Sequence, residues 1–380
     1  MDVLIEPKKL NGRVQAIQSK SHAHRAMICA ALAGRRNVVQ LVRPSEDLLA
    51  TEQAVGIFEG AGTADCRESG TTLRLLVPPA AALGIEATFT GEGRLPRRPM
   101  EPLLGILEQH GARFSSDTLP FTLSGALKSG RYAVPGDISS QYVSGLLLAL
   151  PLLAGDSELV LTTALESAGY VDMTIECQRQ FGIEIGQTAC GWRIPGNQAY
   201  SAPGSFKVEG DWSNAAFWLV ATALGSRVDV PGLSDTSLQR DRLIRAIIER
   251  GEKDIDVRDI PDLVPVLAVL AAGNEGKTVI RNGGRLRLKE SDRIASVSAM
   301  IKNLGGTIDS LGDDIAITGH GRLAGGSVDS AGDHRIAMAA AIAATICTAP
   351  VRINGAQAVS KSYPDFFAHY AQLGGDVHVL

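Results

Sequence analysis

The sequence predicts an α/β protein of two domains built from repeated units. At 380 residues the chain exceeds what one hydrophobic core usually supports, and its 45% hydrophobic content supplies apolar surface for two. Six times along the chain, an apolar-faced helical run ends at a glycine and leads into a short strand. Six such units divide naturally into two sets of three.

The glycines set the length of the repeat. They are Gly60, Gly111, Gly182, Gly251, Gly305 and Gly374. The first and last are 374 − 60 = 314 residues apart over five intervals, or about 63 residues per unit. That length holds about two helices and three or four strands of ordinary size. Alternating apolar and polar residues at 307–309 and 376–379 predict strands after two of the glycines. The plain alternative is that any α/β protein ends helices at glycines.

Positive charge is dispersed rather than accumulated. The formal net charge is −4, and the basic residues of interest each lie in a short polar or glycine-containing segment. They are Lys20, Arg25, Arg74, Arg98, Lys289, Arg293, Arg335 and Lys361. This pattern favours a site for a small, highly charged anion over a nucleic-acid surface. Aromatic residues, at 5%, are not interleaved with basic ones as in single-strand binders.

Several other classes of protein find no support. The five cysteines are far apart, with no C-x-x-C pair, which argues against disulfides or structural zinc. The N-terminus lacks a secretory signal, and the apolar stretches 143–154 and 336–349 are too short to span a bilayer. No dinucleotide or P-loop motif is present. His22 and His24 do not share a helix face, so no metal is predicted. We expect a cytoplasmic protein.

Two segments of the first half join polar residues to predicted helix starts. The segment QSKSHAHR, with Lys20 and Arg25, precedes a helix in which a serine cap would leave N–H groups facing an anion. The segment ESGTTLR brings Gly70, where backbone can approach a ligand, within about one turn of Arg74. Taken singly, a capped helix with solvated basic residues explains each equally well.

Three further segments offer anion or hydroxyl contacts. The loop RLPRRPM holds arginines between prolines and suits a carboxylate or phosphate clamp. The segment ISSQY precedes an apolar helix, and SAGY adds a hydroxyl and a phenol. The residues concerned are Arg98, Ser139, Ser140, Gln141, Ser167 and Tyr170. An ordinary surface loop explains each segment when it is taken alone.

The second half repeats the arrangement with more charge. The segment IPD places Asp262 before an apolar helix, where we expect it to act as an N-cap. The segments RLKESDR, GDHR and SKSYPD follow, and plain helix starts or a surface turn would explain them too. They contribute Lys289, Glu290, Arg293, Arg335 and Lys361. The predicted helices of this half cover 263–272, 294–304 and 336–344.

Taken in order, these segments resemble the enolpyruvyl transferase family, and within it the members that act on shikimate 3-phosphate. The motifs SKS…HR, SGTTxR, RRPM, SSQ, IPD, LKESDR, GDHR and SKSYPD span nearly the whole chain. The resemblance implies two similar domains, each of three βαβαββ units around a pseudo-threefold axis, an inside-out α/β barrel. It implies one lobe of 19–210, another of 1–18 and 211–380, and an active site in the cleft between them.

The implied reaction joins the enolpyruvyl group of phosphoenolpyruvate to the 5-hydroxyl of shikimate 3-phosphate and releases phosphate through a tetrahedral intermediate. It belongs to the shikimate pathway to chorismate and aromatic amino acids. No metal or organic cofactor is implied, only the two small substrates, and we expect a monomer whose free form is open. Asp262 would be the hydroxyl base and Glu290 the methylene acid, with Lys20 an alternative proton carrier.

By resemblance, each substrate has its own residues. Shikimate 3-phosphate would be held by Lys20, Ser21, Arg25, Ser139, Ser140, Gln141, Ser167, Tyr170, Asp262 and Lys289. Phosphoenolpyruvate would be held by Lys20, Gly70, Arg98, Gln141, Arg293, Arg335 and Lys361.

One departure and three rivals stay open. Many relatives have Asn where this chain has Glu68, and an added carboxylate could weaken anion binding. Gly70 keeps the small-residue contact expected for phosphoenolpyruvate and glyphosate. The UDP-N-acetylglucosamine enolpyruvyl transferases share the fold but usually carry a cysteine in the RLPRRPM loop, which has none here. A non-catalytic anion-binding scaffold and a relative of RNA 3′-phosphate cyclase are the others.

Overall fold

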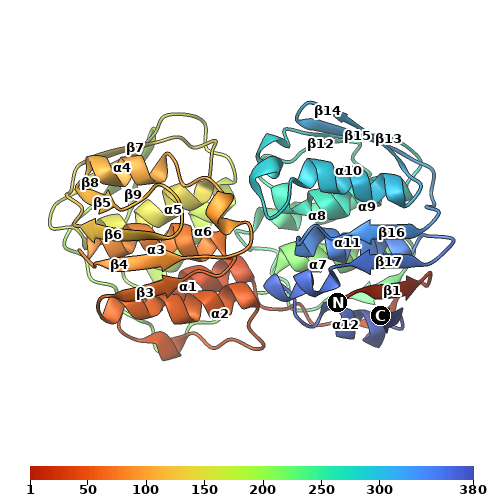
Figure 1. Ribbon diagram of the computed structural model, residues 1–380, viewed down its shortest axis with the longest axis horizontal. Helices are drawn as coiled ribbons and strands as arrows, with labels where there is room; N and C mark the ends of the chain where they lie inside the picture. The colour runs from red at the N-terminus through yellow and green to blue at the C-terminus, as the bar shows by residue number, and fades with distance from the viewer. The chain divides into compact units, whose positions relative to one another are not determined.

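The computed structural model describes residues 1–380, and the chain divides into two compact units. One unit is Lys20–Val208, and the other combines Met1–Ser19 with Glu209–Leu380. The family resemblance implies boundaries after residues 18 and 210. In Figure 1 the red-to-yellow elements belong to the first unit, and the green-to-blue elements, together with the red strand β1, belong to the second.

Three sheets are each built by one uninterrupted βαβαββ run. The first run is β3 (Gly62–Asp65), α3 (Gly70–Ala82), β4 (Ala87–Thr90), α4 (Leu103–Gln109), β5 (Ala112–Phe114) and β6 (Phe121–Gly125). The second is β7 (Arg131–Val134), α5 (Ser140–Ala149), β8 (Ser157–Leu161), α6 (Ala168–Gln180), β9 (Gly186–Thr188) and β10 (Gly191–Ile194). The third is β12 (Asp254–Asp256), α9 (Val264–Gly273), β13 (Gly276–Arg281), α10 (Arg293–Asn303), β14 (Thr307–Leu311) and β15 (Asp314–Gly319). In each run the first two strands pair in parallel, and the fourth strand pairs antiparallel with both the second and the third.

The fourth sheet has the same pairing but is closed by the N-terminus. Its run is β16 (Gly326–Asp329), α11 (His334–Ala344), β17 (Val351–Asn354), α12 (Phe366–Gln372) and β18 (Asp376–Val379). The missing fourth strand is supplied by β1 (Val3–Glu6), which lies antiparallel between β17 and β18. The two chain ends therefore lie close together, as Figure 1 shows.

Two reduced repeats complete the set of six. One consists of α1 (Lys20–Leu32) and α2 (Glu46–Ala54) with a single bridge from Val39 to Phe206. The other consists of α7 (Trp212–Ala223) and α8 (Ile244–Arg250) with the parallel pair β2 (Asn11–Arg13) and β11 (Arg227–Asp229). The twelve α-helices thus form six pairs, three in each unit. Each of the six glycines follows the second helix of a pair, and each has a positive φ that glycine adopts at little cost.

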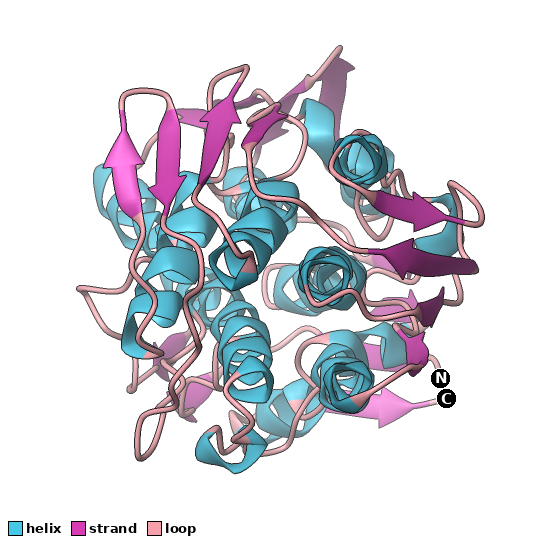
Figure 2. Cartoon of the chain, turned by 90° about the vertical axis from the view of Figure 1, so that its left-hand side faces the viewer, coloured by secondary structure: helices cyan, strands magenta, loops and turns pink.

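Most residues of the first helix of each pair are buried. Every residue of α11 is buried, as are all residues of α9 except its terminal glycine. A Cβ at Gly145 of α5 would collide with the backbone of Arg74 in α3, so glycine allows these two helices to approach closely. In the view of Figure 2 the strands lie around the outside of the helices. One apolar core fills each unit. None of the helices is long and apolar enough to cross a membrane.

Candidate functional site

Most of the polar residues singled out in the sequence lie at helix N-termini. In the unit Lys20–Val208 they occupy the starts of α1, α3, α5 and α6, and in the other unit the starts of α9, α10 and α11. The first N–H groups of a helix have no partner within the helix and carry partial positive charge, so these ends attract anions. The repeat therefore presents the same kind of anion-binding end several times.

Arg25 is the centre of a buried polar group between α1 and α6. Its side chain is 2% exposed, and Nε donates to Thr174 Oγ1 at 2.7 Å and to the backbone oxygen of Tyr170 at 3.2 Å. Nη1 donates to the backbone oxygen of Ser21 at 2.8 Å, and Nη2 to Ser144 Oγ at 3.4 Å. Burial lowers the pKa of Arg25 to about 10, so the group stays protonated at neutral pH. Because these partners are uncharged, the positive charge is available to an anionic ligand.

Gly70 opens α3 against two guanidinium groups. A Cβ at this position would lie 2.8 Å from Nη1 of both Arg74 and Arg98. Arg74 is held in place because Nη1 donates to Gln141 Oε1 at 3.1 Å and Nη2 to the backbone oxygen of Pro99 at 3.0 Å. Because Gly70 has no side chain, both guanidinium groups approach the first turn of α3, so two cations and the N–H groups of a helix start lie together.

Gln141 links the starts of α5 and α3. Its Nε2 donates to Thr71 Oγ1 at 2.9 Å, and its backbone N–H donates to Ser139 Oγ, the N-cap, at 3.3 Å. Ser140, the first residue of α5, is buried. Ser167 precedes α6 with φ 56°, an uncommon conformation for a residue other than glycine. Together with Ser21 in the first turn of α1, the serines expected to contact shikimate 3-phosphate thus lie at three helix starts.

Lys20 has a carboxylate partner that sequence reasoning missed. Its Nζ lies 2.7 Å from Asp47 Oδ2 of α2, and the two side chains are 13% and 12% exposed. Asp47 follows Ser45 at a helix start and resembled an ordinary first-turn acid. The ion pair orients the ammonium group at the start of α1.

A buried hydrogen-bond chain connects α1 to the cap of α3. His24 Nδ1 lies 2.7 Å from Thr51 Oγ1, which lies 2.6 Å from Thr72 Oγ1. Thr72 donates to Ser69 Oγ at 2.7 Å, and that oxygen caps α3. Burial, with Lys20 and Arg25 nearby, holds the pKa of His24 well below its ordinary value, so this side chain is a neutral structural group.

The arginine loop and Glu68 differ in what they contribute. Arg98 reaches Gly70, whereas Arg94 and Arg97 are exposed. The Glu68 carboxylate lies against Gly93, where any side chain would collide with it. Of the three arginines in this loop, Arg98 is the one that the resemblance selects, and it is also the one that lies beside the start of α3.

Arg293 is the centre of a second cluster, in the other unit. Its side chain is 1% exposed and donates to three carboxylates. Nε lies 2.8 Å from Asp333 Oδ2, Nη1 lies 2.7 Å from Asp262 Oδ1, and Nη2 lies 2.8 Å from Glu290 Oε2. Burial alone would lower the pKa of Arg293, but the carboxylates raise it well above its ordinary value. One permanent cation thus fixes the positions of three acids.

The expectation that Asp262 caps the helix of 263–272 is wrong. Asp262 lies in a 3₁₀ turn, Pro261–Leu263, and α9 begins at Val264 without a side-chain cap. Its Oδ1 accepts from Arg293, and its Oδ2 accepts from Arg335 Nη2 at 3.1 Å. Burial would raise the pKa of Asp262, but Arg335, Lys289 and Arg293 hold it well below the ordinary value. Two arginines add the attraction of full positive charges, which a neutral helix amide does not supply.

Two lysines complete this cluster. Lys289 Nζ lies 3.6 Å from Asp262 Oδ1, and burial lowers the pKa of this lysine. Lys361 Nζ donates to the backbone oxygen of Gly332 at 2.8 Å, three residues before Arg335. The candidate residues of the second half thus gather around α9, α10 and α11.

Two buried acids of this cluster were not among the predicted site residues. Asp333 is fully buried, caps α11 by accepting from the N–H of Arg335 at 2.9 Å, and binds Arg293. Asp241 is 3% exposed, and burial together with Asp262 raises its pKa to about 7. In the sequence both look like ordinary acids at helix starts. Burial distinguishes them from such acids, and burial cannot be read from the local sequence.

We expect Asp241→Asn to reduce the loss of stability that accompanies a rise in pH from about 4 to 7. The unfolded carboxyl ionises near pH 4 and the folded one near pH 7, so the associated stability is complete below pH 4 and is lost as pH rises through 7. Between pH 5 and 8 the unfolding free energy of the variant should fall by about 2 to 3 kcal/mol less than that of the parent. Urea unfolding followed by the fluorescence of Trp212 and Trp218 measures this. Asp117→Asn, at an exposed loop, is the control, and an identical pH profile for Asp241→Asn would contradict the assignment.

Three comparisons identify similar proteins. A family model described as EPSP synthase (3-phosphoshikimate 1-carboxyvinyltransferase) matches residues 58–369. The 3-phosphoshikimate 1-carboxyvinyltransferase of Clostridium kluyveri is 42% identical over 417 aligned positions, covering 99% of this chain and 98% of that protein. The enzyme of the same name from Clostridium acetobutylicum is 40% identical, with the same coverage. A solved EPSP synthase from Acinetobacter baumannii has a TM-score of 0.81 and 25% identity, and the match covers all of both chains.

Proposed function

The chain belongs to the EPSP synthase family, and we propose that it transfers the enolpyruvyl group of phosphoenolpyruvate to the 5-hydroxyl of shikimate 3-phosphate. The observation that carries this proposal is the 42% identity over nearly the full length of a 3-phosphoshikimate 1-carboxyvinyltransferase. The predicted two-domain α/β fold and the predicted family are confirmed by the same comparisons. The product leads toward chorismate and the aromatic amino acids.

The charges of the two clusters support this choice of substrates. Together the substrates bring two phosphates and two carboxylates, and holding them close together costs Coulomb energy unless cations are already in place. Arg25, Arg74 and Arg98 supply cations in one unit, and Arg335, Lys289 and Lys361 supply them in the other, where Arg293 already binds three carboxylates. We propose that both clusters act on one pair of substrates, with the residue assignments given by the family resemblance.

The chemistry needs two proton transfers at the methylene carbon. The 5-hydroxyl oxygen bonds to C2 of phosphoenolpyruvate, loses its proton to a base, and C3 gains a proton. Elimination then removes a proton from C3 and breaks the bond from C2 to the phosphate oxygen, and the departing phosphate takes up the proton that the base received in the first step. We propose that Asp262 receives the hydroxyl proton and that Glu290 gives and retakes the C3 proton, with Lys20 as the alternative carrier. Each step is balanced without a cofactor.

Substrate binding would adjust both carboxylates to these roles. In the free protein the arginines hold the pKa of Asp262 too low for an efficient base. Anionic substrates would neutralise part of the charge of Arg293 and Arg335, which raises the pKa of Asp262. The same anions, placed near Glu290, would favour its protonated form. The proton carriers therefore become active when the substrates arrive.

A phosphate-release assay tests the proposal. Purified protein should release phosphate from phosphoenolpyruvate in the presence of shikimate 3-phosphate and not in the presence of UDP-N-acetylglucosamine. Phosphate release only with UDP-N-acetylglucosamine would show that the nucleotide sugar is the acceptor. ATP-dependent RNA binding would instead favour a relative of RNA 3′-phosphate cyclase. We also propose a cytoplasmic monomer, which gel filtration and cell fractionation test.

We expect Gly70→Ala to raise the KM for phosphoenolpyruvate by about tenfold. The added methyl would sit 2.8 Å from two guanidinium groups and occupy the space beside them, so the arginines must shift and the anion loses room. Steady-state kinetics with varied phosphoenolpyruvate measure the change, while the KM for shikimate 3-phosphate should change less. Gly56→Ala is the control, because the nearest atom to its added Cβ is 3.9 Å away. An unchanged KM would remove Gly70 from the phosphoenolpyruvate contacts.

A further inference from the structure

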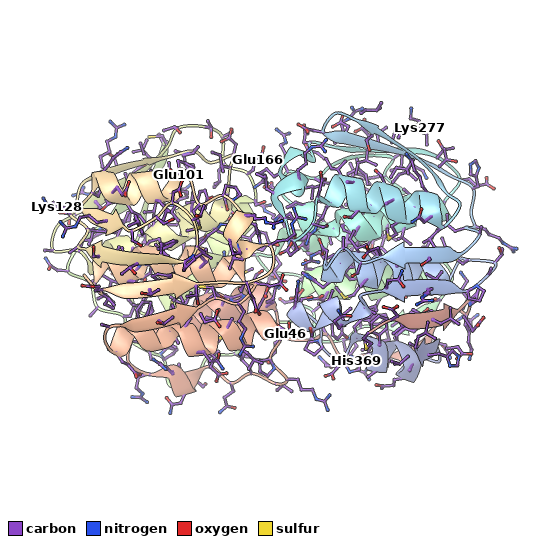
Figure 3. The ribbon with its side chains drawn as sticks, in the orientation of Figure 1. Glu46, Glu101, Lys128, Glu166, Lys277 and His369 are labelled. Atoms are coloured by element: carbon purple, nitrogen blue, oxygen red, sulfur yellow. The ribbon has the colours of Figure 1, made fainter.

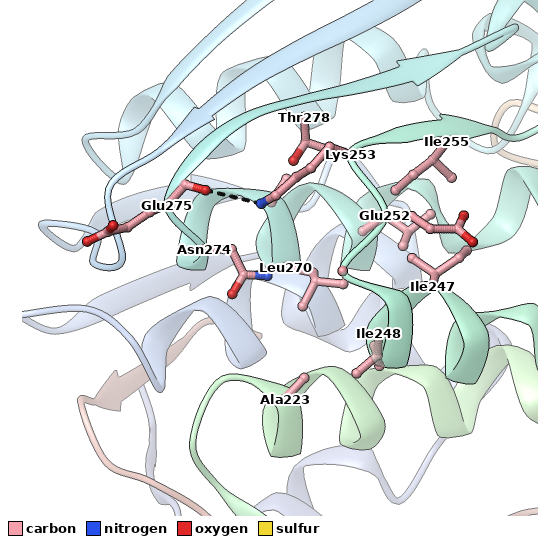
Figure 4. A pocket seen from close by; sticks show the side chains of 13 residues that line it. Ala223, Ile247, Ile248, Glu252, Lys253, Ile255, Leu270, Asn274, Glu275 and Thr278 are labelled. Carbon is pink, nitrogen blue, oxygen red and sulfur yellow. Dashed lines mark hydrogen bonds between the residues drawn. The ribbon is translucent and has the colours of Figure 1, made fainter.

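A cavity lies in the unit that contains Glu209–Leu380, and no residue of the Arg293 cluster lines it. Its volume is about 420 Å³, within the range of small-molecule sites. It lies among the end of α7, helices α8 and α9, and the starts of β12 and β13. Figure 4 shows these elements around the hollow.

The body of the cavity is apolar. Its walls include Ile247, Ile248, Ile255, Leu267 and Leu270. Four of these belong to the core of the unit, and Ile248 packs against that core. In Figure 4, Leu270 and Ile248 lie below Lys253 and Thr278. A compact ring or aliphatic body would therefore bury its surface here by the hydrophobic effect.

Two hydrogen-bond donors, Thr278 and Lys253, lie at the end of the cavity opposite Leu270 and Ile248. Thr278 is 2% exposed, and its hydroxyl makes no hydrogen bond within the chain, although buried hydroxyls normally do. Lys253 Nζ donates to the backbone oxygen of Glu275 at 3.2 Å, which uses one of its three N–H bonds. A ligand oxygen could accept from both groups.

The charges around the cavity favour one negative charge on the ligand. In Figure 4 the carboxylates of Glu252 and Glu275 point away from the centre, and Glu252 Oε1 lies 3.5 Å from Arg250 Nη1. Of the three charged residues that line the cavity, Lys253 is therefore the one whose charge lies at the donor end. A single lysine matches a carboxylate and not a pair of phosphates, which distinguishes this cavity from the site of the proposed reaction.

We propose that this cavity binds a small monocarboxylate with a compact apolar ring. The ring lies on the leucine and isoleucine wall, and the carboxylate accepts from Lys253 and Thr278. The inference does not depend on the proposed reaction.

The test is a ¹⁹F NMR titration of the full-length protein with 4-fluorobenzoate. We expect saturable binding with a dissociation constant on the order of a millimolar, as for a ligand of about ten heavy atoms. The neutral 4-fluorobenzamide should bind about tenfold more weakly, because it loses the charge-assisted bond. Equal affinity for both probes would overturn the proposal. So would the absence of binding at a probe concentration ten times the expected dissociation constant.

Four variants locate the binding. Lys253→Met and the nearly isosteric Thr278→Val should each weaken 4-fluorobenzoate by about fivefold or more. Ala223→Phe, at an exposed lining residue, should block the cavity without disturbing the core. Lys277→Met is the matched control, since this exposed lysine precedes Thr278 on β13 and does not line the cavity (Figure 3). With folding checked by circular dichroism, binding that survives Ala223→Phe and Lys253→Met would place the probe elsewhere and refute the site.

Discussion

Glu290→Gln is expected to lower kcat for enolpyruvyl transfer by roughly 10² to 10⁴ while leaving the KM values within about threefold. The amide keeps the size of the side chain and its oxygen can still accept from Arg293 Nη2, now 2.8 Å away. It cannot deliver or retake the C3 proton. Phosphate release under saturating substrates gives kcat, and calorimetric titration with shikimate 3-phosphate checks that binding is retained.

The chain offers a closely matched control for this change. Glu176 and Arg179 have the same spacing and the same 2.8 Å separation as Glu290 and Arg293, but they are exposed on α6. Glu176→Gln should therefore leave turnover unchanged. If Glu290 only positions Arg293, kcat should fall with no change in the solvent deuterium isotope effect. If Glu290 carries the proton, that isotope effect should grow, and unaltered turnover would exclude Glu290 from the reaction.

Much of the fold follows from local sequence signals. The glycine after every second helix marks six units because each needs a residue that adopts positive φ, and this requirement is visible in the sequence. The closing of the fourth sheet by Val3–Glu6 is not visible. That strand pairs with residues more than 340 positions away, and nothing within the strand itself specifies the partner.

The apolar part of a helix begins later than the helix itself where the site begins. The apolar runs start at residues 26 and 143, whereas α1 begins at Lys20, close to the expected serine cap, and α5 begins at Ser140. Apolar periodicity is absent from these first turns because their side chains are the polar groups of the site. A functional helix start therefore weakens the pattern by which a helix is recognised.

The cations of the site were predictable and their acidic partners were not. Arg25, Arg293 and Arg335 are conspicuous because a basic residue at the start of an apolar helix needs an explanation. Asp47, Asp333 and Asp241 resemble caps or first-turn acids, which are common. Their role depends on burial and on contacts between different repeats, and neither property is encoded locally.

The largest effect on stability is expected for Arg293→Met. The guanidinium is 1% exposed and binds Asp333. Asp333 is fully buried and pairs with no other arginine or lysine. Without Arg293, Asp333 remains a buried carboxylate lacking its cation, and Asp262 and Glu290 each lose a bond. Removing one partner of a buried pair typically costs about 3 to 5 kcal/mol. Urea unfolding should show a loss of that size.

Arg281→Met separates burial from the mere number of ion pairs. Arg281 also binds two carboxylates, with Nε 2.6 Å from Asp254 Oδ1 and Nη1 3.4 Å from Asp314 Oδ2, but its side chain is 47% exposed. Water can replace these bonds, so the expected loss is below about 1 kcal/mol. Adding Asp333→Asn to Arg293→Met should recover part of the stability, since the second change removes the stranded charge. Equal losses for the two arginine variants would show that the cluster stabilises the fold no more than a surface ion pair does, and that its three acids are held by packing instead of by the guanidinium.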